Sequence, residues 1–145
     1  MAIGNEDGNV RIWDVQTGAL QKTLSGQHSK WIVRVLAPSP DIVISSSQDP
    51  LVVVWNVHLG EPRHILQGST DTVQDMVQSE DLLFGGARDG AVYVWNLATG
   101  QQVHILQDHL NRSVGYVALN PDESLLATAL SGGGMGIWDV SSGYH

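Results

Sequence analysis

Short runs of apolar and β-branched residues follow one another along the whole chain, and turn residues separate them. The run at residues 42–47 ends at a turn at residues 48–50. The next run, residues 51–55, is apolar at every position, which is typical of a strand buried on both faces. Residues 60–62 are expected to turn the chain again, and residues 72–77 alternate as a half-buried strand does. The pattern predicts an all-β protein made of short strands.

The same pattern repeats along the chain. Four tryptophans, Trp13, Trp55, Trp95 and Trp138, end near-identical runs at spacings of 42, 40 and 43 residues. A glycine stands five residues after each of them, at Gly18, Gly60, Gly100 and Gly143. An aspartate stands six residues before the first three, at Asp7, Asp49 and Asp89, and the fourth place holds Gly132. This periodicity predicts that each period folds as the same unit of four short strands.

The sequence closely resembles the WD-repeat (β-transducin-like) propellers, which have a period of ~40–45 residues and four strands per blade. The Trp-Asp signature stands at residues 13–14 and 138–139, and the two middle copies have Trp-Asn. The resemblance implies strands a to d in each blade, from the central channel outward. Counted in this way, the chain runs from a strand b to a strand c. We therefore expect an all-β partial WD-repeat propeller with about 14 antiparallel strands in three to four blades.

The expected organisation is one WD-repeat array over residues 1–145. The blades are expected at residues 1–24 (partial), 25–66, 67–106 and 107–145 (partial). Closed propellers typically have 4–8 blades. We therefore expect the chain to be a segment of a longer propeller. Self-association through the open blade edges is the alternative, since unpaired edges and uncovered faces favour assembly.

The resemblance also implies a hydrogen-bond network inside a blade. It joins a histidine of the d–a loop, a serine of strand b, an aspartate of the b–c turn and the tryptophan of strand c. Only the second period supplies all four, as His28, Ser47, Asp49 and Trp55. Buried polar groups that pair in this way satisfy one another. The same residue types also make catalytic triads, but their spacing here is that of the structural network, so no catalytic residue is expected.

The other periods depart from this set. The third has Ser69 at the histidine place and Ala87 at the serine place. The fourth has His109, with Leu130 and Gly132 in place of serine and aspartate. We expect those two blades to be held more by packing than by this network.

Partners of such propellers are expected on the face that carries the d–a loops and the b–c turns. The resulting partner-binding candidates are Trp31, Lys30, Gln48, Arg88, Asp71, Arg112 and Glu6. Trp31 is the only tryptophan outside the repeat position, and exposed Trp and Arg dominate binding energy at interfaces. Arg88, Arg112 and Lys30 are either a sparse basic cluster, of the kind that reads phosphorylated or acidic motifs, or solvated loop charges.

Composition narrows the range of partners. Seven Lys and Arg against 15 Asp and Glu give a net charge of -8, which argues against nucleic acid or an anionic membrane as the main partner. The absence of cysteine excludes disulfides, zinc-thiolate sites and cysteine nucleophiles. No apolar run approaches the ~20 residues of a spanning helix, and the start of the chain lacks a signal-peptide pattern. We expect no cofactor or metal and a cytoplasmic or nuclear location.

The function expected from these features is a non-catalytic protein–protein interaction scaffold with a protein or peptide partner. One alternative is a phosphopeptide or degron reader within a ubiquitin-ligase substrate receptor. A weaker alternative is a propeller hydrolase, which needs several acids or histidines on the inner strands. The expected inner strands offer mostly valine and leucine instead. Because the fold alone does not choose a partner, the pathway stays open.

Overall fold

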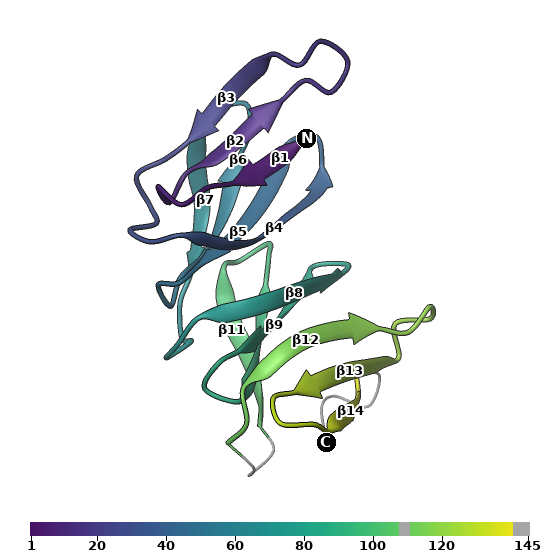
Figure 1. Ribbon diagram of the computed structural model, residues 1–145. Helices are drawn as coiled ribbons and strands as arrows, with labels where there is room; N and C mark the ends of the chain where they lie inside the picture. The colour runs from purple at the N-terminus through teal and green to yellow at the C-terminus, as the bar shows by residue number, and fades with distance from the viewer. Residues whose placement is uncertain (108–110, 141–145) are drawn as a thin grey trace.

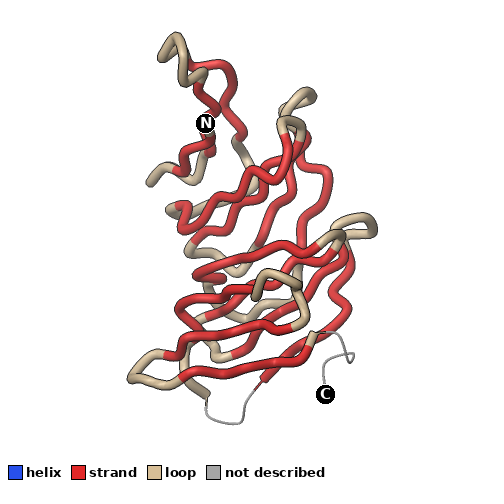
Figure 2. The backbone as a smooth tube through the Cα atoms, turned by 90° about the vertical axis from the view of Figure 1, so that its right-hand side faces the viewer, coloured by secondary structure: helices blue, strands red, loops and turns tan. Residues whose placement is uncertain are grey.

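The computed structural model describes residues 1–107 and 111–140. These residues form fourteen antiparallel strands in four sheets and no helix (Figure 2), so the expected all-β partial propeller is confirmed. Over the same residues there is accordingly no helix long and apolar enough to cross a membrane.

Each sheet is built from strands that follow one another in the sequence. The first sheet contains β1 (Ala2–Gly4), β2 (Val10–Trp13) and β3 (Leu20–Leu24). The second contains β4 (Ile32–Ser39), β5 (Ile42–Ser47), β6 (Val52–Asn56) and β7 (Glu61–Leu66). The third contains β8 (Val73–Ser79), β9 (Leu82–Ala87), β10 (Ala91–Asn96) and β11 (Gln101–Gln107). The fourth contains β12 (Val114–Leu119), β13 (Leu125–Leu130) and β14 (Met135–Asp139).

The sheets succeed one another along a row, with β1, β4, β8 and β12 lying next to one another on the inner side (Figure 1). Strands β4, β8 and β12 are the innermost strands of their sheets, and strands β3, β7 and β11 form the outer edges. β1 is the inner edge of the first sheet, but it takes the place of β5 because it pairs with the strand that carries the repeat tryptophan. The two middle sheets have four strands each, whereas the described parts of the first and fourth sheets have three. The inner strands therefore bring loops from successive sheets to a common rim.

The core lies between neighbouring sheets, because successive residues of a strand point to opposite faces. On β6, Val53 and Trp55 pack toward the first sheet, whereas Val52 and Val54 pack toward the third. Each of these side chains is buried, and burying one such side chain contributes about 1.5–3 kcal/mol. This two-sided burial explains why the strand has no polar position before Asn56.

The turn expected at residues 60–62 is displaced toward the N-terminus, and that prediction was wrong. The backbone N–H of Gly60 donates to the carbonyl of Asn56 at 2.9 Å, and Gly60 has a φ of 74°. β7 then begins at Glu61, so Pro62 lies inside the strand, opposite Trp55 at an irregularity in the pairing. Proline is tolerated there because β7 is an edge strand, where one side of the backbone needs no ladder partner.

Candidate functional site

A closed hydrogen-bond network ties the second sheet to the loop before it. The His28 Nδ1 lies 3.1 Å from Asp49 Oδ1, and the His28 Nε2 lies 2.9 Å from Ser45 Oγ. The Trp55 indole N–H donates to the same Ser45 hydroxyl oxygen at 2.9 Å. All four side chains are buried. The Ser45 hydroxyl accepts from Trp55 and donates to the Nε2 of His28, and the Nδ1–H of His28 donates to Asp49, so every group finds a partner.

The serine of this network is Ser45 and not Ser47, and that prediction was wrong. The Ser47 hydroxyl donates to the Lys30 carbonyl at 3.2 Å and accepts from the Asp49 N–H at 3.1 Å. The pairing of β5 with β6 ends at Ser46, so Ser47 is the last residue of β5 and pairs only with Ile32 of β4. Ser45 lies two residues earlier on the same face of the strand, within reach of the indole of Trp55.

The two titratable residues of this network, His28 and Asp49, are both engaged in hydrogen bonds. Burial alone would raise the pKa of Asp49, but hydrogen bonds from the Ser29 N–H and from His28 outweigh it and hold the pKa below its ordinary value. Both ring nitrogens of His28 are engaged, one with Asp49 and one with Ser45. The histidine therefore holds the loop in place and has no free nitrogen for proton transfer.

A different network replaces this one in the third sheet. Asp89 accepts a hydrogen bond from the Tyr93 hydroxyl at 2.8 Å and others from Thr70 and the Ala91 N–H. Burial opposes the charge of Asp89, but these bonds outweigh it and lower the pKa of the carboxyl group. The Trp95 indole N–H donates to the Gln67 carbonyl at 2.8 Å. The third blade is thus held by polar contacts as well as by packing.

The geometry of β9 explains the change of partner for Trp95. Gly85 stands at the repeat place of Ser45, and a Cβ atom there would lie 2.7 Å from the Trp95 ring. The ring therefore fills the space that the serine occupies in the second sheet. Tyr93 was not predicted as a member of a network. The sequence does mark it, since a tyrosine stands two residues before the tryptophan where the second blade has Val53.

The fourth sheet lacks a comparable set among the residues described. The Trp138 indole nitrogen is buried without a hydrogen-bond partner there, and Thr128 stands at the place of Ser45. His109 lies outside the described residues. The b–c turn has positive φ at Gly132, Gly133 and Gly134, a region that favours glycine. The Arg112 guanidinium reaches across and donates to the Gly133 carbonyl at 2.8 Å.

A polar hollow of about 450 Å³ opens where the inner strands begin. Its lining residues are Val33, Arg34, Gln48, Thr72, Gln74, Asp75, Arg88, Gly115 and Tyr116. Gln48 and Arg88 are thus the partner-binding candidates that border it. Tyr116, which sequence reasoning missed, is 72% exposed. It occupies the same repeat position on the inner strands as Arg34 and Asp75. An alignment of the repeats therefore indicates it as a residue of the same surface.

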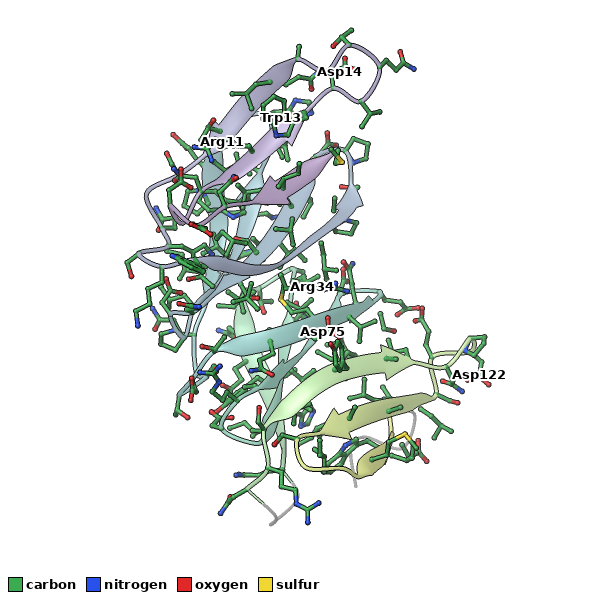
Figure 3. The ribbon with its side chains drawn as sticks, viewed as in Figure 1. Arg11, Trp13, Asp14, Arg34, Asp75 and Asp122 are labelled. Carbon is green, nitrogen blue, oxygen red and sulfur yellow. The ribbon has the colours of Figure 1, made fainter. Side chains whose placement is uncertain are left out.

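The floor of the hollow is fixed by one buried carboxylate. The Arg34 Nε lies 2.9 Å from Asp75 Oδ1, and the Val117 N–H donates to Asp75 Oδ2 at 3.1 Å. Figure 3 shows Arg34 and Asp75 on the neighbouring strands β4 and β8. Asp75 therefore connects the inner strands of the second, third and fourth sheets.

The remaining partner-binding candidates differ in exposure and in their position relative to the hollow. Trp31 is 52% exposed, and its carbonyl accepts the Gln48 N–H at 2.9 Å, which places it beside that turn. Lys30 and Glu6 are exposed, and neither lines the hollow. Asp71 is half-buried, and its carboxylate accepts the Thr72 N–H at 2.6 Å. The structure therefore brings Gln48 and Arg88 to one hollow, with Trp31 at its margin.

The expected basic cluster is not assembled in the hollow. Arg88 lines it, is exposed and makes no hydrogen bond or ion pair with another described side chain. Arg112 is turned to the Gly133 carbonyl instead, and Arg34, which does line the hollow, is paired with Asp75. Among the residues that the structure describes, one guanidinium at this rim, that of Arg88, is thus unpaired.

Comparisons with known proteins agree with the fold. The family model described as WD domain, G-beta repeat matches residues 60–96 and 100–139, just over half of the chain. Nuclear distribution protein nudF of Emericella nidulans is 35% identical over 72 residues, which cover 48% of this chain and 16% of that protein. Protein tipD of Dictyostelium discoideum is 32% identical over 68 residues, 47% of this chain and 11% of that protein. The chain thus spans less than a fifth of either relative.

A solved structure is similar over nearly the whole chain. The crystal structure of the computationally designed Ika4 protein superposes with a TM-score of 0.82 at 25% identity, over 95% of this chain and 83% of that one. The fold similarity and the family match point the same way, and the chain belongs to the WD-repeat family.

Proposed function

We propose that this chain is a non-catalytic protein–protein interaction scaffold that binds a protein or peptide segment at the hollow bordered by Gln48 and Arg88. The observation that carries the proposal is the exposed Arg88 guanidinium at the rim of this hollow, which pairs with no other side chain in residues 1–107 and 111–140. The exposed side chain of Tyr116 also lines the hollow, and the exposed Trp31 adjoins it through the backbone hydrogen bond to Gln48. Exposed Trp, Tyr and Arg are the residue types that dominate binding energy, and rigid strands hold the loops that present them.

The chemistry of the hollow favours an acidic segment. Gln48, Thr72 and Gln74 give it polar walls that form hydrogen bonds with an extended backbone. A carboxylate of the partner pairs with Arg88 in a charge-assisted hydrogen bond, which is about twice as strong as a neutral one. The partner class proposed is therefore a protein segment that carries Asp or Glu.

A phosphopeptide or degron reader within a ubiquitin-ligase substrate receptor is the second candidate. Arg88 supports it, because arginine also binds phosphate. Readers of phosphate motifs use clusters of arginines, however, and the other two arginines near this rim are engaged. Arg34 pairs with Asp75, and Arg112 donates to Gly133. A single carboxylate therefore matches the free donors better than a phosphate does.

A propeller hydrolase has less support from the inner strands. Asp75 is the acid there that lines the hollow, and both of its oxygens are engaged, one with Arg34 and one with the Val117 N–H. A general acid or base needs an accessible oxygen within hydrogen-bond reach of the substrate. Asp75 acts instead as the anchor of the three inner strands.

The proposed setting is the cytoplasm or the nucleus, with a protein partner and without nucleic acid or membrane. The net charge of -8 supports this, since both excluded partners attract positively charged surfaces. Joining to further blades, or self-association, through the open edges of the first and fourth sheets stays a prediction. Fluorescence imaging of the tagged chain tests the location, and enrichment at a membrane contradicts it.

Selection from a displayed peptide library tests the proposed binding. The immobilised chain is expected to enrich peptides with Asp or Glu. Arg88→Ala is expected to weaken the binding of these peptides about tenfold or more. Arg63→Ala is the matched control, because Arg63 is also exposed but lines a separate crevice with Asp81 and Ala98. Equal binding by the two variants contradicts the proposal. Tighter binding of phosphorylated versions supports the second candidate.

A further inference from the structure

The outer strand of the third sheet, β11, has an unusually bare edge. It pairs with β10 on one side and forms the edge of the sheet on the other. Its seven residues, 101–107, include no charged residue and no proline. Val103 is 43% exposed and Ile105 is 50% exposed. Uncharged segments of this length with β-branched residues are the ones that readily add another strand.

The two strands at the same place in the preceding sheets are protected. β3 carries Lys22, whose ammonium group donates to the His58 carbonyl of the second sheet. β7 begins with Glu61, Pro62 and Arg63, so charges and a proline stand on that edge. Proteins use such residues to prevent edge-to-edge pairing. The bare edge of β11 is thus a departure from the pattern set by β3 and β7.

The sequence of β11 is also nearly self-complementary. In an antiparallel pair of two β11 strands centred on His104, Val103 lies opposite Ile105 of the other copy. Gln101 lies opposite Gln107 in the same arrangement, so amide side chains flank the apolar pair at both ends. Residues directly opposite each other in such a pair have Cβ atoms about 4.5–5.5 Å apart, and β-branched pairs stabilise the sheet. β11 has no Asp, Glu, Lys or Arg, so none of the chain's net charge of -8 lies on the strand that forms the contact.

We propose that a second copy of this chain pairs with β11 in antiparallel orientation and forms a closed dimer. The pairing joins the third sheets of the two copies into one continuous sheet. Because each copy uses the same strand, the contact is two-fold symmetric and leaves no further edge of this kind open. The edge strands β1 and β14 differ from each other, so pairing of β1 in one copy with β14 in the next would form an open-ended row of copies. The β11 contact is small, and small interfaces are weak, so the dimer is expected to depend on concentration.

Light scattering on the 145-residue chain after gel filtration tests the dimer. The mass is expected to rise from 15.7 kDa toward twice that value as concentration increases. Ile105→Lys is expected to abolish the rise. Ile65→Lys, a change at the same repeat place on β7, is expected to leave it unchanged. A monomer at every concentration contradicts the proposal, as does a dimer that persists in Ile105→Lys or growth into larger assemblies.

Cross-linking gives a second readout that does not depend on the stability of the lysine variant. The chain has no cysteine, so one introduced cysteine reports one contact. His104→Cys places two cysteines opposite each other at the two-fold axis and is expected to form a disulfide-linked dimer under mild oxidation. His64→Cys, at the same repeat place on β7, is the matched control and is expected to stay monomeric. Linking at both positions or at neither contradicts the proposed register.

Discussion

The Arg34 guanidinium and the Asp75 carboxylate form an ion pair of 2.9 Å that joins the inner strands of two different sheets. The other oxygen of Asp75 accepts the Val117 N–H of a third sheet. Asp75 is buried, whereas Arg34 is about half exposed. The Asp75 carboxylate therefore holds together the three inner strands that line the hollow.

Removal of Asp75 is expected to destabilise the array. Asp75→Ala leaves the buried Val117 N–H without its acceptor and is expected to lower the free energy of unfolding by about 1–3 kcal/mol. Arg34→Ala is expected to cost less, about 0.2–1 kcal/mol, since exposed ion pairs contribute little. Urea unfolding followed by tryptophan fluorescence measures both values. A larger loss for Arg34→Ala than for Asp75→Ala contradicts this assignment.

Replacement of two adjacent serines on β5 by alanine is expected to change stability by different amounts. Ser45→Ala removes the partner of the Trp55 N–H and is expected to lower the free energy of unfolding by about 1–3 kcal/mol. Ser46→Ala is the matched control, because the Ser46 hydroxyl is buried without a hydrogen-bond partner. Its removal is expected to leave stability unchanged or to raise it. Equal losses in thermal or urea unfolding would contradict the hydrogen-bond assignment.

The hydroxyl of Tyr93 is expected to stabilise the third blade through Asp89. Tyr93→Phe keeps the ring and its stacking on Trp95 but removes the 2.8 Å hydrogen bond. The free energy of unfolding is expected to fall by about 0.5–1.5 kcal/mol, because Thr70 and the Ala91 N–H still bind the carboxylate. Calorimetric unfolding measures the change. The combination with Asp89→Asn is expected to be less than additive, and strict additivity contradicts the contact.

Acid is expected to weaken the two networks. The pKa values of Asp49 and Asp89 are lowered in the folded chain, so their ionised forms favour folding. This contribution is complete above the unfolded value of 3.8 and is lost as pH falls through the folded values. Unfolding by urea at several pH values is expected to show stability that falls steeply in acid. The stability of the Asp49→Asn variant is expected to fall less steeply as pH is lowered. If the variant and the unchanged chain lose stability in parallel, Asp49 does not link folding to pH.

The sequence was sufficient to predict the architecture. The spacing of Trp13, Trp55, Trp95 and Trp138 located the four sheets, since one strand of each sheet ends at or next to its tryptophan. The apolar run at residues 51–55 predicted burial on both faces, and Val53 and Val54 indeed face different sheets. These features depend on short-range patterns, which a sequence displays directly.

The polar contacts needed the three-dimensional register. Ser45 and Ser47 lie on the same face of β5, and only the point where pairing with β6 ends decides which of them meets Trp55. The exchange of a histidine network for Tyr93 in the third blade likewise depends on the space beside Gly85. Asp75 and Val117 are separated by 42 residues, so their contact appears only when the sheets are placed side by side.

Hydrogen exchange on the chain with and without a library-selected acidic peptide tests whether the hollow bordered by Gln48 and Arg88 binds the partner. Slower exchange is expected at the turns that contain Gln48 and Arg88 and at the start of β12 near Tyr116. Exchange on the outer strand β7 is expected to stay unchanged. Protection confined to β7 or to the crevice lined by Arg63 and Asp81, with no change at Arg88, would contradict the claim that this hollow binds the partner.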